Sequence, residues 1–367
     1  MKTHKKSHNL VWTLGLLPVI FMATSAQASS DYIVVVEEEC VSTGFVQVAG
    51  VSDTEELSDR IVKVSVDQES TVNALRQDKC LESVEPDQEV KIATSSFNDS
   101  FYNVQWYLHN TGQSVLGQKG VNDVDIDFPE ARSKFSNREV TVAVVDTGVD
   151  EITELSGKVL PGYNFVDNNT NPDDQNGHGT FIANLIAARS NNSTGIVGLY
   201  EPTKILPVKV LSSFGSGLLS DLIEGIDYAV EQDVDIINLS LVTSYTTALD
   251  SVIEKAHNNG VIVVAASGNE GENINGGNRK SPIGNDGSND WVIGVGAHDN
   301  RGNRADFSNF GNDVDTLAPG EGIVGITIGN AAQYQNGTSI ATAVVSGIVA
   351  AWEGYYGDVT PSQAHSL

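Results

Sequence analysis

Residues 336–347 read NGTSIATAVVSG, and the rest of the chain can be interpreted around this segment. It places Ser339 directly after a Gly-Thr pair, at the start of a predicted helix of small and apolar residues. At a helix N-terminus, free backbone N–H groups and the positive end of the dipole favour developing negative charge, so Ser339 is a candidate nucleophile. Serine is also a common helix N-cap, and the segment alone leaves that alternative open. Catalysis by serine further needs a base, an orienting carboxylate and oxyanion donors.

Composition limits the classes of protein to consider. The chain has 367 residues, 40% of them hydrophobic, which is enough for one large core and a small additional domain. Its net charge of −27 argues against nucleic acid and anionic membranes as partners, because both attract basic surfaces. The two cysteines, Cys40 and Cys80, lie early in the chain, outside any segment of catalytic character. In an exported protein such a pair can form a disulfide.

Residues 1–28 have the pattern of a secretory signal peptide. Three lysines precede a short apolar run over residues 10–22, and Ala26-Gln27-Ala28 is an A-x-A cleavage signal. The run is shorter than a transmembrane helix requires. We expect cleavage after about Ala28 and a secreted protein, extracellular or periplasmic, with no membrane anchor afterwards.

Residues 29–95 are predicted to form a small α+β domain. Segments rich in β-branched residues predict strands over residues 32–36, 61–66 and 81–87, and residues 72–80 are expected to form a short helix. A domain this small is marginally stable alone, so a disulfide between Cys40 and Cys80 would help to hold it. The stretch from Ala93 to Asn103 is polar, as expected of an exposed, cleavable linker.

Residues 96–367 are predicted to form a three-layer, doubly wound α/β domain. Nearly continuous apolar segments predict strands of a mostly parallel sheet that is covered on both faces, over residues 140–145, 205–211, 234–241, 261–266 and 291–295. Between them, residues 219–230 and 249–256 carry helical apolar stripes. In such folds, functional sites lie at the carboxyl ends of the strands.

Polar motifs follow at those ends. Asp146 ends the first predicted strand, His178 begins a predicted helix, and Asn269 follows the strand over residues 261–266. Taken singly, each has an ordinary structural interpretation: a turn-capping aspartate, a helix-start histidine and a left-handed turn residue. Together with Ser339 they supply a carboxylate, a base, an amide donor and a nucleophile, which is the equipment of acyl transfer by serine.

The four motifs resemble those of the subtilisin-like serine proteases, the subtilase family. They read DTGVD (146–150), NGHGT (176–180), SGNEG (267–271) and GTSIAT (337–342), in the order Asp, His, Ser. The resemblance covers about residues 31–367. It implies that Ser339 is the nucleophile, His178 the general base and then acid, and Asp146 the group that orients the imidazole. Asn269 and the backbone N–H of Ser339 would form the oxyanion hole.

The resemblance also assigns the flanking segments. Residues 29–95 look like the family's inhibitory propeptide, and the mature chain that follows has thermitase-like features. Self-processing is expected between about Ala93 and Asp99, from the linker composition. The family's catalytic domains usually continue beyond the position of Leu367, so the resemblance implies a shortened C-terminal part. The expected product is a monomeric secreted endopeptidase with its own propeptide as intramolecular inhibitor.

Protein or peptide substrates would bind between two backbone segments. By resemblance these are Gly215-Ser216-Gly217 and Ser240-Leu241-Val242, which would pair with an extended peptide by β-augmentation. The family usually has glycine where this chain has Val242, and the larger side chain should narrow the specificity pocket. We therefore expect a preference for small P1 residues.

Calcium is the expected cofactor, at two candidate sites. One is a loop before His178 that is rich in hard oxygen ligands, with Asp167, Asn169 and Asp173 as candidates; a solvated loop without an ion is the equal alternative. The other resembles the family's strong site and combines side chains with backbone carbonyls, from Asp99, Glu154, Asn192, Thr194 and Ile196. Both would be structural.

Two other functions stay open. Ile340, Ala343 and Val344 replace the methionine, proline and histidine that are usual around the family's nucleophile, and Val242 is a further departure. The first three do no chemistry, but Val242 and the shortened C-terminal part favour a catalytically silent binding or scaffold protein of the same fold, which is the main alternative. An esterase is disfavoured because no G-x-S-x-G motif surrounds Ser339.

Overall fold

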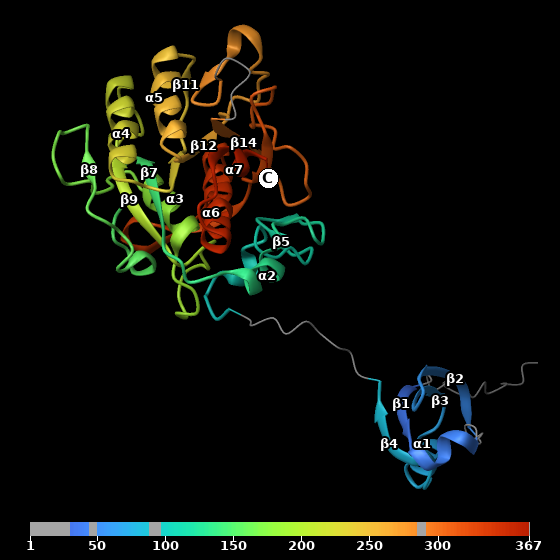
Figure 1. Cartoon of the computed structure of the whole chain (residues 1–367). Helices are drawn as coiled ribbons and strands as arrows, with labels where there is room; N and C mark the ends of the chain where they lie inside the picture. The colour runs from blue at the N-terminus through green and yellow to red at the C-terminus, as the bar shows by residue number, and fades with distance from the viewer. Residues whose placement is uncertain (1–29, 44–49, 88–96, 285–290, 367) are drawn as a thin grey trace, which may run out of the picture. The chain divides into compact units, whose positions relative to one another are not determined.

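The computed structural model describes residues 30–43, 50–87, 97–284 and 291–366. These residues belong to two compact units, Met1–Ala93 and Thr94–Leu367 (Figure 1). The predicted signal peptide, residues 1–28, lies outside the described residues. Among the helices that are described, none is long and apolar enough to cross a membrane.

The N-terminal unit is an antiparallel sheet with one helix. Its strand order is β2-β3-β1-β4, with β1 at Ser30–Val36, β2 at Val51–Ser58, β3 at Ile61–Val66 and β4 at Leu81–Pro86. Helix α1 (Glu69–Arg76) packs its apolar face on the sheet. A disulfide joins Cys40 to Cys80, with their Cα atoms 5.6 Å apart, which answers the open question of their pairing.

Two details of this unit differ from the prediction. The helix expected over residues 72–80 begins at Glu69 and ends at Arg76, because the Asp78 carboxylate accepts a bond from Cys80 N (2.9 Å) and closes a turn there. Strand β2 was not predicted. After its first residue all of its side chains are exposed, so it carries no alternation of buried and exposed residues that could reveal it.

The larger unit is built on a seven-stranded sheet, counted over its described strands. The order is β15-β14-β12-β10-β7-β9-β8, and every adjacent pair is parallel. The strands are β7 (Val140–Asp146), β8 (Tyr163–Asn164), β9 (Thr203–Lys209), β10 (Ile236–Leu239), β12 (Ile262–Ala266), β14 (Val292–His298) and β15 (Thr316–Pro319).

Helices cover both faces of this sheet. On β7, Val142 and Val144 belong to one buried cluster, together with residues of α3 (His178–Ala187) and α6 (Thr338–Tyr356). The alternate residues Ala143 and Val145 belong to the other cluster, with α4 (Leu219–Glu231) and α5 (Thr247–Asn258). Figure 1 shows α4 and α5 side by side. The predicted three-layer, doubly wound parallel fold is confirmed.

Some strands of the larger unit differ from the prediction. The strand expected over residues 234–241 is confined to Ile236–Leu239, because Ser240 leaves the sheet to bond with Ser339. The hairpin of β16 (Ile323–Thr327) and β17 (Ala331–Gln335), which leads into α6, was not predicted, nor was β15.

Strand β7 is the switch point of the sheet. The next strands of the chain, β8 and β9, lie on one side of β7, and the later strands β10, β12, β14 and β15 lie on the other side. In open parallel sheets a crevice forms at the carboxyl ends where the order reverses. The residue at the carboxyl end of β7 is Asp146.

Candidate active site

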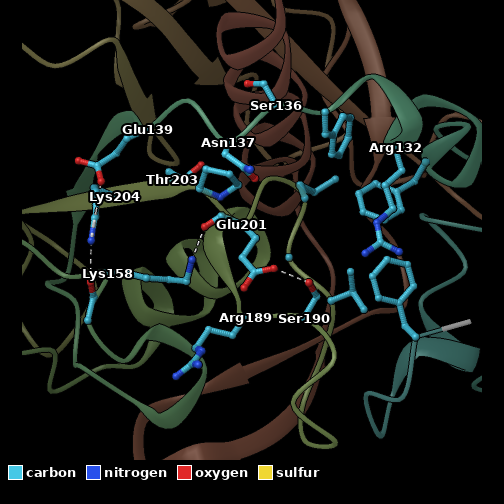
Figure 2. Close-up of a pocket in the computed structure, with 18 of the residues that line it drawn as sticks. Arg132, Ser136, Asn137, Glu139, Lys158, Arg189, Ser190, Glu201, Thr203 and Lys204 are labelled. Carbon is cyan, nitrogen blue, oxygen red and sulfur yellow. Dashed lines mark hydrogen bonds and ion pairs between the residues drawn. The ribbon is translucent and has the colours of Figure 1, made fainter. Parts of the chain in front are cut away.

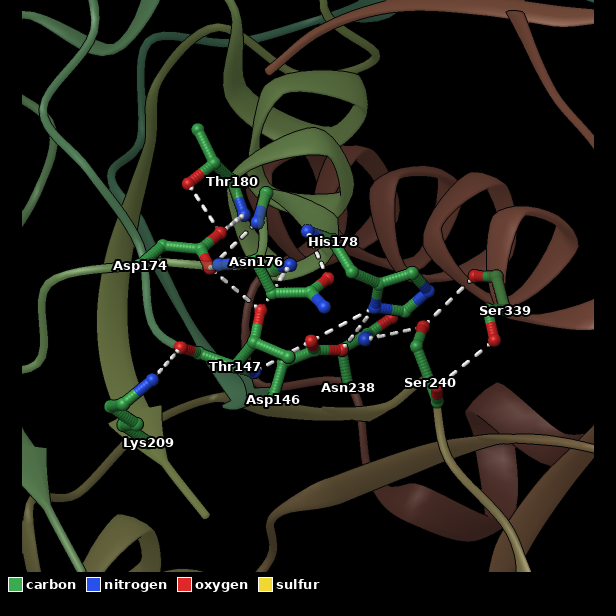
Figure 3. A network of polar contacts seen from close by, with 12 residues as sticks. Asp146, Thr147, Asp174, Asn176, His178, Thr180, Lys209, Asn238, Ser240 and Ser339 are labelled. Atoms are coloured by element: carbon green, nitrogen blue, oxygen red, sulfur yellow. Dashed lines mark hydrogen bonds and ion pairs between the residues drawn. The ribbon is translucent and has the colours of Figure 1, made fainter. Parts of the chain in front are cut away.

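The candidate triad comes from three elements that meet at this switch point. Asp146 ends β7, His178 begins α3, and Ser339 lies in the first turn of α6. Gly179 permits the close approach of α3 to β7, because a Cβ there would lie 2.1 Å from the carbonyl oxygen of Gly148 and 3.1 Å from the Cβ of Asp146. Figure 3 shows the imidazole of His178 between Asp146 and Ser339.

Asp146 and His178 form a close pair. Nδ1 of His178 lies 2.9 Å from each carboxylate oxygen of Asp146, which is fully buried. The N–H of Thr147 donates to the same carboxylate (2.6 Å). Since an ionised carboxylate only accepts hydrogen bonds, Nδ1 carries the proton and the neutral ring keeps its lone pair on Nε2.

The pKa of His178 is raised by its surroundings. Burial of the ring disfavours the imidazolium, but the charge of Asp146, its hydrogen bond and the charge of Asp174 outweigh that effect, so the pKa lies above its ordinary value. The side chain is 27% exposed, which leaves it open to the crevice. The site therefore stabilises the form that the ring would take after accepting a proton.

Ser339 exchanges two hydrogen bonds with Ser240. Its hydroxyl donates to the carbonyl of Ser240 (2.9 Å), and the hydroxyl of Ser240 donates to the carbonyl of Ser339 (2.9 Å). Among the hydrogen bonds recorded for the described residues, none joins the Ser339 hydroxyl to His178. Rotation about the Cα–Cβ bond of Ser339 would redirect its hydroxyl, and catalytic bonds of ligand-free sites commonly tighten only when substrate is bound.

Asn269 lies next to Ser339 in space. Its Oδ1 accepts from the backbone N–H (2.8 Å) and the hydroxyl (3.0 Å) of Thr338. Thr338 is fully buried, and its hydroxyl also accepts from the N–H of Gly268 (3.1 Å). Because the oxygen of the Asn269 amide is held in this way, its orientation is set and the amide NH₂ remains as the donor end.

A cavity of about 480 Å³ adjoins these residues. His178 and Ser339 line it together with all six predicted substrate-binding residues, Gly215, Ser216, Gly217, Ser240, Leu241 and Val242. The structure thus gathers both predicted backbone segments around the candidate nucleophile. Leu211, Leu218 and Leu222 complete an apolar part of the lining.

A larger cavity of about 690 Å³ shares no lining residue with the first (Figure 2). It lies beside the amino ends of β7 and β9, where Glu139 and Thr203 line it. Its two lysines are engaged: Lys158 donates to the carbonyl of Glu201, and Lys204 donates to the carbonyl of Gly157 (2.8 Å). It is therefore separate from the candidate triad.

In the structure, Glu154 and Asp99 both contact the loop that carries the other residues of the second predicted calcium site. The Glu154 carboxylate accepts from Asn192 Nδ2 (2.8 Å) and Thr194 Oγ1 (2.6 Å), and Asp99 Oδ2 accepts from the N–H of Asn191 (2.9 Å). Ile196, in the same loop, is fully buried. Asp99 Oδ1 is buried, and no hydrogen-bond partner for it occurs in the described residues.

In the first predicted calcium loop, the oxygens bond within the loop itself. Asn164 Oδ1 accepts from Asp167 N (3.0 Å), and Asn169 Oδ1 accepts from Asn171 N (2.8 Å). Asp173 follows in the same loop and is exposed. In the described chain, no cluster of three or more acidic, histidine or cysteine side chains suits a metal ion.

Sequence interpretation missed Asp174 and Thr147. The Asp174 carboxylate is nearly buried and bonds with the Thr147 hydroxyl (2.9 Å). Asp174 lies four residues before His178, where an acidic residue near a helix N-terminus was the available signal. Its other partners follow it closely in the chain, but Thr147 lies 27 positions before it, so only the folded chain reveals that contact.

The geometry has a counterpart among known proteins. The model of the subtilase family matches residues 137–367. The chain therefore belongs to the subtilase family of serine peptidases, and the resemblance drawn from the four motifs is confirmed.

Individual relatives support this assignment. The chain is 39% identical over 284 residues to a thermophilic serine proteinase of Bacillus sp. strain AK1, covering 77% of this chain and 65% of that protein. It is 31% identical over 360 residues to a thermostable alkaline protease of Halalkalibacterium halodurans, covering 96% and 90%. The chain is also 39% identical to a cell wall-associated protease of Bacillus subtilis, but it spans only 28% of that protein. The chain thus spans less than two thirds of two of these relatives.

Solved structures share the fold. A cold-adapted subtilisin-like serine proteinase superposes with a TM-score of 0.59 at 31% identity, covering 71% of this chain and 89% of the other. A protease from Pseudoalteromonas arctica gives a TM-score of 0.65 at 26% identity, covering 74% and 91%.

Proposed function

We propose that the protein is a secreted serine endopeptidase in which Ser339 is the nucleophile. The observation that carries this proposal is the Asp146–His178 pair, whose ring borders the same cavity as Ser339 and both predicted peptide-binding segments. Membership of the subtilase family supports the same reaction.

The proposed acylation begins with the Ser339 hydroxyl. Oγ attacks the scissile carbonyl carbon while its proton passes to Nε2 of His178, and the Nδ1–H of the resulting imidazolium stays bonded to Asp146. Negative charge then develops on the carbonyl oxygen. Asn269 Nδ2 and the Ser339 N–H would donate to it. His178 returns the proton to the leaving amine, and an acyl-enzyme remains.

Deacylation repeats these steps with water. His178 takes a proton from the water as it attacks the acyl carbon, and gives that proton back to Ser339 Oγ as the acid product leaves. The base must be neutral at the start of each half-reaction. Since the pKa of His178 is raised, kcat/KM should increase with pH through that raised value and level off above it.

Substrate is proposed to bind as an extended peptide between Gly215-Ser216-Gly217 and Ser240-Leu241-Val242. Main-chain hydrogen bonds to both segments would provide affinity, and alternate side chains would enter pockets. Val242 lines the cavity beside Ser240 and Ser339. Its bulk supports a preference for small P1 side chains.

The N-terminal unit is proposed to act as the inhibitory propeptide, released by self-cleavage between about Ala93 and Asp99. Its disulfide supports synthesis in an oxidising compartment, and hence export directed by residues 1–28. The mature enzyme is proposed to be a monomer.

Calcium is proposed at the site of Asp99 and Glu154. Among the described residues, Oδ1 of Asp99 is buried without a hydrogen-bond partner, which an ion would satisfy. The neighbouring loop would add the backbone carbonyls of Thr194 and Ile196, and the amide oxygen of Asn192, which now accepts from Thr194, could turn to the ion. Oxygen donors of this kind suit a hard cation. When bound, the ion would stabilise the folded state without entering the reaction.

The test compares the full chain with its Ser339→Ala variant. We expect the parent to cleave itself near residues 93–99, to react with a fluorophosphonate probe and to degrade casein, and the variant to do none of these. A parent that is folded but neither processed nor labelled would indicate the silent binding protein. Labelling with ester turnover but no casein cleavage would indicate an esterase.

A further inference from the structure

Asp174 lies behind the Asp146–His178 pair and has no part in the proposed reaction. Asp174 is 4% exposed and lies on the loop that leads into α3. Oδ1 accepts from Thr147 Oγ1 (2.9 Å), Asn176 N (2.9 Å) and Gly177 N (2.8 Å). Oδ2 accepts from the N–H (3.0 Å) and the hydroxyl (2.7 Å) of Thr180. Figure 3 shows this carboxylate with its partners.

Four of these five bonds stay within residues 174–180, the stretch that contains His178, and the bond from Thr147 joins this stretch to the end of β7. Thr147 directly follows Asp146, Gly177 directly precedes His178, and Thr180 lies in the first turn of α3. The Thr147 hydroxyl also accepts from Gly179 N (3.0 Å), so it connects both sides. The N-cap residue of α3 is a glycine, which has no capping side chain, and Asp174 satisfies N–H groups of this helix end in its place.

We propose that Asp174 is a positioning residue, which holds the imidazole of His178 against Asp146 through the five bonds of its carboxylate. The inference rests on the proposed function, since it concerns the same His178. Removing one hydrogen-bonding oxygen of a buried carboxylate leaves its donors unsatisfied, which costs free energy. The geometry of the Asp146–His178 pair therefore depends on the Asp174 carboxylate.

The charge of Asp174 acts on the same ring. Together with Asp146 on β7, it raises the pKa of His178. The other charged groups around Asp174 are Asp150, whose carboxylate accepts from Asp174 N (2.9 Å), Asp173 beside it in the loop, and the buried Lys209 of β9, which donates to the carbonyl of Thr147. Removing the charge of Asp174 should therefore lower the pKa of His178.

The decisive variant is Asp174→Asn. It keeps the size of the side chain and one oxygen, but its NH₂ cannot accept from Thr180 N, and one negative charge is lost. Glu224→Gln, at an exposed position of α4, removes the same charge from the surface as a control. In the full chain, Asp174→Asn should lower kcat/KM about 10- to 100-fold, mainly through kcat, and move the acid limb of its pH profile down by roughly 0.5 pH unit. Glu224→Gln should change neither.

A second measurement does not depend on turnover. The ring of His178 is titrated by NMR in Ser339→Ala protein with and without Asp174→Asn, and its pKa should fall in the double variant. A loss of kcat without any shift of this pKa, or a shift without loss, would overturn the inference. If the parent shows no Ser339-dependent labelling, the proposed function fails, and the titration still decides the role of Asp174.

Should Asp174→Asn not fold, Thr147→Val takes its place. It removes one bond to Asp174 and one from Gly179 without changing charge. It should lower kcat/KM and leave the acid limb in place. Unchanged kcat/KM would contradict the positioning role.

Discussion

The N-terminal unit and the larger unit, Thr94–Leu367, which we call the peptidase unit, fold around very different cores. Among the described residues of the N-terminal unit, the buried apolar cluster has five members: Val34, Val64, Val66, Val72 and Leu75. The peptidase unit has two large clusters, one on each face of its sheet. A fully buried aliphatic side chain stabilises a fold by about 1.5–3 kcal/mol, so the small unit has little to set against its chain entropy. A crosslink is therefore more important there than in the large unit.

The two units also differ in the polar groups that they bury. In the peptidase unit, Asp146, Asp174 and Thr338 are nearly or fully buried, and each has hydrogen-bond partners from other segments. A core large enough to absorb the cost of burying such groups can hold them in one arrangement. The precise arrangement of this site therefore depends on the large apolar core packed around it.

The largest effect is expected from Asp146→Asn. In serine proteases the loss of this carboxylate places the proton on the wrong ring nitrogen and lowers kcat by about 10⁴. We expect a loss of this order in peptide hydrolysis. Because both cores of the peptidase unit stay intact, thermal unfolding should move little. Activity within tenfold of the parent would contradict the role of Asp146.

The next effect concerns the crosslink of the small unit. Replacing Cys40 and Cys80 by serine opens a loop of 40 residues, which in a chain-entropy model costs on the order of 4 kcal/mol. We expect this change to unfold residues 29–95 prepared alone, as followed by circular dichroism. Ser339→Ala protein carrying the same two changes should keep the melting transition of its peptidase unit. A small unit that melts as before would show that its five-residue core suffices.

Calcium removal should have an intermediate effect, limited to the peptidase unit. At a calcium concentration 100 times the Kd, binding adds about 2.7 kcal/mol to the free energy of unfolding. EDTA should therefore lower the melting temperature of the Ser339→Ala protein, and Asp99→Asn should abolish that response. Glu224→Gln should retain it. An EDTA response that persists in Asp99→Asn would place the ion elsewhere.

The smallest effect is expected at the cavity wall. Val242→Gly should enlarge the P1 pocket and raise the ratio of kcat/KM for phenylalanine over alanine at P1 by about tenfold, since differences of a few methylene groups in a pocket are worth about 1–3 kcal/mol. Matched peptides that differ only at P1 would measure it. A parent that already cleaves best after phenylalanine or tyrosine would contradict the narrow pocket.

Much of the architecture could be predicted because local patterns coincide with it. Apolar runs such as the one over residues 140–145 predicted buried parallel strands, and the stripe over residues 219–230 predicted α4 almost to its ends. Segments without such a pattern were missed. Strand β2 is exposed almost throughout, and β17 is exposed along most of its length, so neither shows the alternation that marks a half-buried strand.

The sequence by itself determined the family and nominated Asp146, His178, Asn269 and Ser339, since short motifs at the ends of apolar strands carry that information. Only the tertiary structure decided how they meet. It placed the Nδ1 atom of His178 at a distance of 2.9 Å from the carboxylate of Asp146. It also directed the Ser339 hydroxyl to the carbonyl of Ser240 and brought the Asp174 carboxylate to the hydroxyl of Thr147. Those contacts join residues from about 30 to 100 positions apart, and hydrogen bonds of that kind are specified by the packing of whole elements rather than by neighbours in the chain.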